Sequence, residues 1–308
     1  MSAWPPQHLT TEARCLFLTR SAHEAFSVRG PDRKSWLNGL LTNNVTKVRS
    51  GQAGWGLALT KQGKIQSELW LVERGEELLV FAPPGQAAGL VELLDRFLIM
   101  EDAELDLAPS QRLVVLVGPD AEPQAAALAR DESGVAWGVF DVTGFGGALI
   151  AVNEAEVAAT EARFRDAGAA ALDEAAWSVL RAERFLPEWG IDYALESNPH
   201  EAGIAHRALG QGPVDWDKGC YLGQEVVCMQ DMRGKVRRSL FPLWIDGTAL
   251  PPSDAEVTDA EGLAVGQLRS RVVAPGDQGV LGFAFLKTAA VDTELQVNGA
   301  AAKLLASS

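Results

Sequence analysis

Cysteine, histidine and tyrosine are scarce in this 308-residue sequence, which contains three, four and two of them. The cysteines, Cys15, Cys220 and Cys228, are too few for a disulfide framework and fit a reducing compartment, so we expect a cytoplasmic protein. The histidines form no His-x-x-x-His pair and the cysteines no Cys-x-x-Cys pair. Neither spacing indicates a protein-built metal site, and we predict none.

Long apolar runs and basic residues are also in short supply. No segment approaches the roughly 20 apolar residues needed to cross a bilayer, and the first residues lack the basic-then-apolar order of a secretory signal. We therefore expect no membrane association. Lysine and arginine total 27 against 41 acidic residues, which gives a net charge of -14. Because an acidic surface repels phosphate backbones, we expect no general binding of nucleic acid.

Three common catalytic and nucleotide-binding motifs are missing. The sequence has no Gly-x-Gly-x-x-Gly after a strand and no Gly-x-x-x-x-Gly-Lys-Ser/Thr. It also has no Gly-x-Ser-x-Gly. These absences argue against a dinucleotide site, a P-loop and the nucleophile elbow of a hydrolase.

What the sequence does have is an internal echo. An apolar run at 113–117 predicts a strand, and Gly-Pro-Asp then opens a helix that ends near Ala129. An alternating stretch at 26–29 is followed by the same triplet and by a helical pattern through Leu41. A second pair of strands, at 75–81 and 146–152, leads into helices with apolar faces, the later one spanning 154–168.

This echo predicts that residues 24–107 and 112–172 are two degenerate copies of one α+β unit, the first with extra strands at 55–60 and 65–72. Chance similarity of common strand-turn-helix chemistry is the alternative. A true duplication would place two sheets face to face, and ligands favour such interfaces.

The remainder of the chain changes character twice. Asp173 caps a helix that Pro187 ends, and residues 187–219 form a long loop of the kind that is often functional. Short alternating strands then predict a small β-barrel or sandwich; they lie at 239–245, 262–269, 279–286 and 294–297. The predicted fold class is α+β, with an α+β region at 1–238 and a C-terminal β-barrel at 239–308.

Cys220 is the first chemical candidate. It lies in the string Lys218-Gly219-Cys220-Tyr221-Leu222-Gly223-Gln224-Glu225. Lys218 and a following helix N-terminus would both favour a reactive thiolate, and the glycines would allow a ligand close to the backbone. The alternative is a buried, inert cysteine, which is the common fate of a free cysteine.

Two further features are open to two interpretations. Arg233, Lys235, Arg237 and Arg238 form a basic run that is either a solvated segment or a site for an anionic ligand tail. Nine tryptophans outnumber two tyrosines, and Trp177 and Trp189 flank the long loop. Each is either a core anchor or a platform on which a flat heteroaromatic ligand stacks.

The string 218–225 resembles the Lys-Gly-Cys-Tyr-x-Gly-Gln-Glu signature of the YgfZ family of folate-binding, iron–sulfur-related proteins. The segments at 41–45, 59–65 and 233–238 are similar to others of that family. The C-terminal segments at 262–267 and 281–286 resemble the barrel that the family shares with the glycine cleavage T-protein. The resemblance covers the chain from about residue 15 onward.

The resemblance implies two related α+β subdomains around a central folate cavity, plus the barrel. It implies a tetrahydrofolate cofactor and iron–sulfur client or assembly proteins as partners, with Cys220 as the functional residue. The implied folate contacts are Glu68, Trp177, Trp189, Lys218, Tyr221, Gln224, Glu225, Arg233, Arg237 and Arg238.

The sequence also resembles the T-protein at 184–190 and 198–204, but Ser67-Glu68 replaces the paired aspartates of that relative. Glu68 keeps a carboxylate that is one methylene longer. We therefore predict a tetrahydrofolate-binding protein that assists maturation or repair of iron–sulfur enzymes. The alternatives are a folate-dependent aminomethyltransferase and a non-catalytic folate sensor or carrier.

Overall fold

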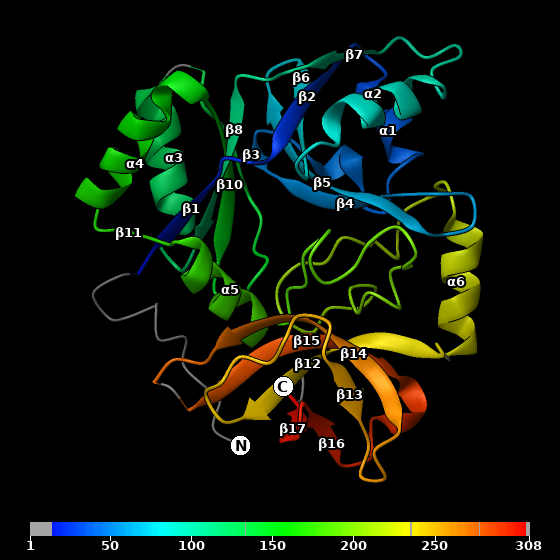
Figure 1. Cartoon of the computed structure of the whole chain (residues 1–308). Coiled ribbons are helices and arrows are strands. Elements are labelled where there is room, and N and C mark those ends of the chain that lie inside the picture. The colour runs from blue at the N-terminus through cyan, green and yellow to red at the C-terminus, as the bar shows by residue number, and fades with distance from the viewer. Residues whose placement is uncertain (1–13, 133, 235, 277, 306–308) are drawn as a thin grey trace.

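The computed structural model describes residues 14–305 except 133, 235 and 277. Two α+β units stand side by side above a C-terminal barrel, and a long irregular segment fills the space among the three (Figure 1). No helix in this described part has both the length and the apolar character needed to cross a bilayer.

The first unit is a five-stranded sheet with the order β4-β5-β6-β2-β7. Its strands are β2 (Glu24–Arg29), β4 (Gly54–Leu59), β5 (Ile65–Arg74), β6 (Glu77–Ala82) and β7 (Glu104–Leu107). Helices α1 (Arg33–Asn38) and α2 (Ala87–Asp95) pack on one face. Their apolar residues, including Leu37, Leu90 and Leu94, share a core with Val80 of the sheet. The 3-10 turn η1 (Val45–Lys47) lies between α1 and β4.

The second unit is a six-stranded sheet with the order β11-β1-β8-β10-β9-β3. Its strands are β1 (Leu16–Arg20), β3 (Gly51–Gln52), β8 (Gln111–Val117), β9 (Ala136–Val139), β10 (Gly147–Asn153) and β11 (Ala170–Ala171). Helices α3 (Ala121–Asp131) and α4 (Val157–Asp166), the latter preceded by the 3-10 turn η2 (Glu154–Glu156), cover one face. Ala125 and Phe164 join Val114 and Ile150 in the core beneath them.

The two sheets share the order of their central strands. The first runs β5-β6-β2 and the second β9-β10-β8, and a Gly-Pro-Asp triplet followed by a helix comes after both β2 and β8. The next position is taken by β7 in the first sheet and by β1 in the second. The second sheet thus recruits β1 and β3 from outside 112–172. This topology supports the inferred duplication, whereas the exact domain limits stay a prediction.

The uncovered faces of the two sheets meet each other. One core contains Trp55 and Leu57 of the first sheet, Val115 and Leu149 of the second, and Phe283 of the barrel. Burial of this apolar surface is what joins the three parts. The predicted central region is therefore a packed interface, and any ligand site must be a local cavity in it.

Helix α5 (Glu174–Glu183) begins as predicted, because the Asp173 side chain accepts a hydrogen bond from the Ala176 amide over 2.7 Å. Residues 184–223 then contain no helix and no named strand. They wind between the sheets and the barrel and lead into α6 (Gln224–Arg233) at the edge of the molecule (Figure 1).

The C-terminal strands close into a barrel of order β12-β15-β14-β13-β16-β17. They are β12 (Arg238–Asp246), β13 (Glu256–Thr258), β14 (Ala264–Val273), β15 (Gly279–Lys287), β16 (Leu295–Val297) and β17 (Ala300–Leu304), with the turn η3 (Thr288–Ala290) after β15. The predicted α+β class with a C-terminal barrel is confirmed.

Candidate functional site

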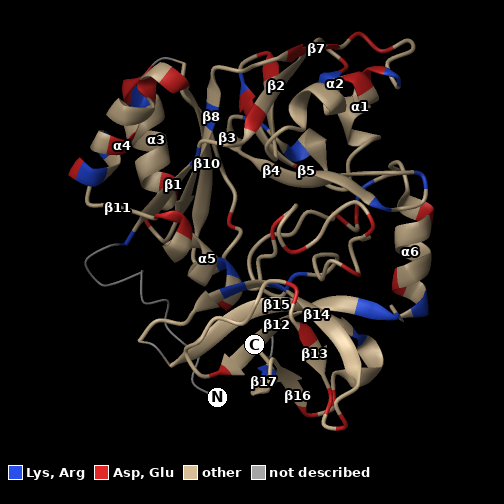
Figure 2. Cartoon of the chain, viewed as in Figure 1, with Lys and Arg blue, Asp and Glu red and all other residues tan. Residues whose placement is uncertain are grey.

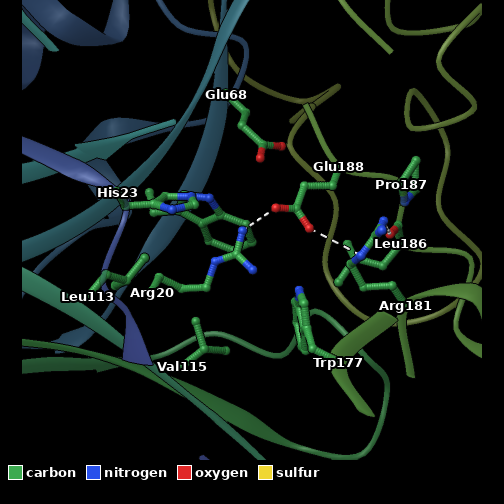
Figure 3. Close-up of a pocket in the computed structure, with 11 residues that line it drawn as sticks. Arg20, His23, Glu68, Leu113, Val115, Trp177, Arg181, Leu186, Pro187 and Glu188 are labelled. Carbon is green, nitrogen blue, oxygen red and sulfur yellow. Dashed lines mark hydrogen bonds and ion pairs between the residues drawn. The ribbon is translucent and has the colours of Figure 1, made fainter. Parts of the chain in front are cut away.

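A small cavity lies between the two sheets, beside α5 (Figure 3). Both sheets, α5 and the start of the long loop contribute to its wall. The lining residues are Arg20, His23, Glu68, Trp70, Leu113, Val115, Trp177, Arg181, Leu186, Pro187 and Glu188.

Buried charges are paired across the cavity wall. The Glu188 carboxylate contacts the guanidinium of Arg20, and its other oxygen lies 3.1 Å from Nε of Arg181. Arg181 also donates from Nη1 to Asp192 Oδ2 over 2.7 Å. The two arginines hold the pKa of Glu188 below its usual range against the opposing effect of burial. Ser270 of β14 donates to the second oxygen of Asp192, so the barrel helps to fix this network.

Glu68 of β5 is a buried carboxyl group of a different kind. It is 3% exposed, and its one side-chain partner in the described chain is the Tyr193 hydroxyl, which donates to Oε2 over 2.7 Å. Burial, reinforced by the negative charge of Glu188, raises the pKa of Glu68 to about 7. A carboxyl group with such a pKa exchanges a proton near neutral pH, as general acids and bases do.

Trp177 of α5 offers the cavity an unused hydrogen-bond donor. The side chain is buried, but its indole Nε1 has no acceptor among the described residues. Figure 3 shows the nitrogen directed from α5 into the space between Arg20 and Arg181. The Arg20 guanidinium carbon lies 5.8 Å from the centre of the Trp177 ring, which is within cation–π range. An unsatisfied buried donor in a cavity wall is a reason to expect an acceptor there.

His23 closes the cavity beside Arg20. Burial lowers the pKa of His23 to about 3, and the nearby positive charge of Arg20 acts in the same direction. The imidazole is therefore neutral at physiological pH, and it adds no charge to the network.

Three of the predicted ligand residues lie in or beside this cavity. Glu68 and Trp177 line it. Trp189 packs edge-on against Tyr193 at 5.7 Å between ring centres and lines an adjoining cleft that also involves Arg20 and Glu188. These side chains come from separate places in the sequence, and the fold brings them together.

Lys218, also predicted as a folate contact, is bound by backbone groups, and its role toward a ligand stays a prediction. Its ammonium group donates to the backbone oxygens of Asn38, Leu41 and Asn43 over 2.6, 2.5 and 2.9 Å. Those bonds use all three ammonium protons, and they fasten the signature segment to the turn after α1. The Tyr221 ring, whose centre lies 5.1 Å from Nζ, packs over the same group.

The backbone geometry at position 223 requires a glycine. Its φ is +82°, and an added Cβ would lie 2.5 Å from the backbone oxygen of Thr60. We expected the signature glycines to allow a ligand close to the backbone. Gly223 instead allows close packing against the backbone of Thr60. Gln224 begins α6 and accepts from the Tyr221 amide over 3.3 Å, and Glu225 is exposed on the first turn.

Cys220 is exposed, four residues before α6 begins. Cys228 is half-buried on α6, and Cys15 is buried in the second unit. The expectation that Lys218 activates Cys220 stays a prediction; the ammonium that we expected to act on the thiol is bound by three carbonyl groups.

The basic run lies at the C-terminal end of α6 and the start of β12 (Figure 2). Arg233, Arg237 and Arg238 are exposed, and Lys235 falls outside the described residues. Arg238 lies over the Phe285 ring at 5.4 Å and at 4.0 Å from Glu201. Among the described residues, no member of this run lines the cavity of Figure 3.

Sequence reasoning missed several charged residues. Arg20, Arg181 and Asp192 gave no local signal, whereas Glu188 lies in the 184–190 segment that resembles the T-protein. Glu183, at the end of α5, was also missed. Burial raises its pKa to about 7, and its two carboxylate oxygens have no hydrogen-bond partner within the described chain.

Comparison with known proteins places this geometry in a family context. Residues 237–307 match the model of the CAF17, C-terminal beta-barrel domain. The tRNA-modifying protein YgfZ of Colwellia psychrerythraea is 24% identical over 71% of this chain and 68% of its own length. An aminomethyltransferase of Rubrobacter xylanophilus is 29% identical over 80% of the chain and 68% of its own.

The solved structure of the glycine cleavage system aminomethyltransferase T from Bartonella henselae has the same fold. It covers 97% of this chain and 87% of its own length with a TM-score of 0.79, at 19% identity. The chain is thus similar in sequence both to YgfZ proteins and to aminomethyltransferases, and it shares the fold of the latter. A relative named as a mitochondrial iron–sulfur cluster assembly factor homologue of Neurospora crassa is 26% identical over 78% of the chain and 56% of its own length. The similar proteins carry three different names, so similarity alone does not select one function for this chain.

Proposed function

We propose that this protein, like the YgfZ and aminomethyltransferase families that it resembles, binds a tetrahydrofolate, and that the ligand occupies the cavity between the two sheets. The observation that carries the proposal is the unpartnered indole N–H of Trp177, which faces a cavity that also holds the buried carboxyl group of Glu68. A donor and an acceptor in an aromatic-walled cavity suit a small heteroaromatic ring.

The pterin ring of a folate fits this donor set. Its edge carries amino and ring N–H donors beside a carbonyl oxygen, so Glu68 would accept and Trp177 would donate. Arg20 and Arg181, held by Glu188, would keep the wall of the cavity in place. The polar atoms of these residues come from β1, β5 and α5, which are rigid elements of the fold.

Two substitutions at one position test the cavity. Trp177→Phe keeps an aromatic wall but removes the N–H donor, and Trp177→Ala removes both. We expect tetrahydrofolate affinity to fall in that order, about ten-fold or more for alanine, because stacking of a ring on an aromatic side chain is worth roughly 1–3 kcal/mol in nucleic-acid complexes. The half-buried Trp137 of β9, changed to alanine, is the matched control. Equal affinity of both Trp177 variants and the wild type would remove Trp177 from the site.

We further propose that the folate-bound protein acts in the cytoplasm to assist maturation or repair of iron–sulfur enzymes. The name of the Neurospora relative and the exposure of Cys220 support this role. Cys220→Ser is expected to preserve folding and folate affinity but to abolish support of iron–sulfur enzyme activity in cells. Cys228→Ser is the control. Full activity with Cys220→Ser would leave a folate sensor or carrier as the better description.

A folate-dependent aminomethyltransferase is the second candidate, and Glu68 is the observation that favours it. Its carboxyl group has a pKa of about 7, and the resemblance to the T-protein assigns this position to one of that relative's paired aspartates. Transfer from an aminomethyl-lipoyl donor to tetrahydrofolate, lost in Glu68→Gln, would establish this activity. Absence of transfer by the folate-bound wild type would exclude it.

A further inference from the structure

Two histidines and an aspartate meet on the surface beside α6. His200 and His206 belong to the long loop, and Asp231 belongs to α6. One ligand atom from each of them lies within 4.8 Å of the other two. The cluster is separate from the cavity of Figure 3, and none of its members lines that cavity.

Hydrogen bonding fixes the chemical form of His200. Its Nε2 lies 3.1 Å from the backbone oxygen of Val227. Because a carbonyl oxygen can only accept, Nε2 carries the proton, and Nδ1 of the neutral ring keeps its lone pair. Burial lowers the pKa of His200, which favours this neutral form. A backbone carbonyl that binds the other ring nitrogen is the usual support of a metal-binding histidine.

His206 is held by its neighbours as well. Its ring stacks on Trp216 with 4.5 Å between centres and 5° between planes, and Trp216 donates to the Ala205 oxygen over 3.1 Å. Nε2 of His206 lies 2.6 Å from Oδ1 of Asp231. The imidazole nitrogen and the carboxylate oxygen are therefore already side by side.

We propose that His200, His206 and Asp231 form a three-ligand site for a divalent transition-metal ion of the Zn²⁺ class. Two imidazoles and one carboxylate suit zinc and its neighbours, whereas Mg²⁺ and Ca²⁺ prefer oxygen ligands. A metal ion would replace the hydrogen bond between His206 and Asp231. With metal–ligand bonds of about 2.0–2.2 Å, ligand atoms of a tetrahedral site lie roughly 3.3 Å apart, so only small side-chain rotations are needed.

The surface position of the site determines what the metal can do. His206 and Asp231 are exposed, so at least one coordination position faces solvent. A bound ion would link the long loop to α6, the helix that begins within the Cys220 signature. The site can take a fourth ligand from water or from a second molecule.

Metal titration of the full-length chain tests this site. After treatment with EDTA, Zn²⁺ binding is followed by calorimetry and Co²⁺ binding by visible absorption. We expect one equivalent to bind and the melting temperature to rise. His206→Gln and Asp231→Asn should each weaken Zn²⁺ binding at least ten-fold. Both side chains are exposed, so the fold, checked by circular dichroism, should be unchanged.

Two controls separate this site from other ligands. Asp217→Asn removes an exposed carboxylate of the same loop, and the double variant Cys220→Ser, Cys228→Ser removes the nearby thiols. Both controls should bind Zn²⁺ as the wild type does, and Co²⁺ should give a spectrum without thiolate absorption. Wild-type affinity in His206→Gln and Asp231→Asn, or loss of binding only in the cysteine variant, would overturn the proposal.

Discussion

The cavity between the sheets and the Cys220 signature segment use buried cations in opposite ways. In the cavity, Arg20 and Arg181 pair with carboxylates and line the proposed ligand site. In the signature segment, the Lys218 ammonium group donates three hydrogen bonds to backbone carbonyls. No carboxylate of the described chain lies at hydrogen-bond distance from it. The first arrangement leaves Trp177 with an unused donor, and the second leaves Cys220 exposed.

The difference lies in where the polar groups find partners: backbone carbonyls within the chain bind the lysine of the signature motif, whereas the cavity leaves a buried donor unpartnered in the described chain. Lys218, Tyr221 and Gly223 fix the conformation of the signature segment. The Cys220 thiol of this segment is exposed. The cavity is built by residues scattered over β1, β5, α5 and the loop after it. We infer that folate recognition belongs to the first region and thiol chemistry to the second.

The largest contrast is expected between the cysteines. Burial raises the pKa of Cys15 to about 12, so very little thiolate is present at pH 8, whereas Cys220 is exposed. Because the thiolate is the nucleophile, we expect Cys220 to be alkylated more than about 10³-fold faster than Cys15, with Cys228 between them. Mass spectrometry of peptides after a timed iodoacetamide pulse measures the rates. Similar alkylation rates for Cys15 and Cys220 would show that burial does not separate the reactivity of the two thiols.

Removal of the lysine anchor should cost the most stability. Lys218→Met leaves three backbone oxygens without their donor, and hydrogen bonds to a charged group contribute about 1.5–3 kcal/mol each. We expect the free energy of unfolding, measured in guanidinium chloride, to fall by at least about 3 kcal/mol in this variant. The exposed Lys61, changed to Met, is the control and should lose almost none. A loss of folate affinity without a loss of stability would instead place Lys218 in the ligand site.

Glu68 should make stability depend on pH. Its folded pKa of about 7 lies above the usual 4.5, so the folded chain binds more protons than the unfolded chain between these values. The contribution of Glu68 to stability is therefore present below about pH 4.5 and is lost as pH rises to about 7. As pH rises over that interval, the free energy of unfolding of Glu68→Gln should increase by about 3 kcal/mol relative to that of the wild type. Denaturant titrations of both proteins at several pH values measure the difference, and parallel curves would show that Glu68 ionises normally.

The smallest effect is expected from the basic run. Arg237 and Arg238 are exposed, so they can act only on a ligand tail that leaves the cavity. Replacing both with Gln should weaken polyglutamylated tetrahydrofolate a few-fold more than the monoglutamate. Added salt should narrow the gap, because exposed charges are screened within about 8 Å at physiological ionic strength. Equal losses for both ligands at every salt concentration would show that these arginines do not contact the tail.

Most of the regular structure followed from local patterns. The Asp173 cap, the apolar run of β8 and the barrel strands β12, β14, β15 and β16 were predicted close to their observed bounds, whereas β13 and β17 were missed. The helix expected through Leu41 ends at Asn38 in the structure. Strand β1 was missed because its partners in β8 lie about a hundred residues away, and β3 and β11 have only two residues each. Such short strands exist through pairing, which sequence patterns do not report.

The candidate site was predictable to a lesser degree. Glu68 and Trp177 came from family resemblance, because single buried residues carry no spacing signal. Arg20 and Arg181 escaped notice because an arginine is normally a surface residue, and only the fold supplies the carboxylate of Glu188. His200, His206 and Asp231 were missed for a similar reason. The loop and α6 bring them together, and no motif spacing describes that arrangement.

The Lys218 anchor also bears on how the chain is made. Its three bonds join residues separated by 175 to 180 positions. During synthesis the first unit emerges long before this lysine, and contacts of such long range form late in folding. A chain that is truncated or stalled before residue 218 cannot close this connection. The segment that carries Cys220 therefore takes its final conformation only after the first unit has folded. Its formation marks the completion of folding of the chain.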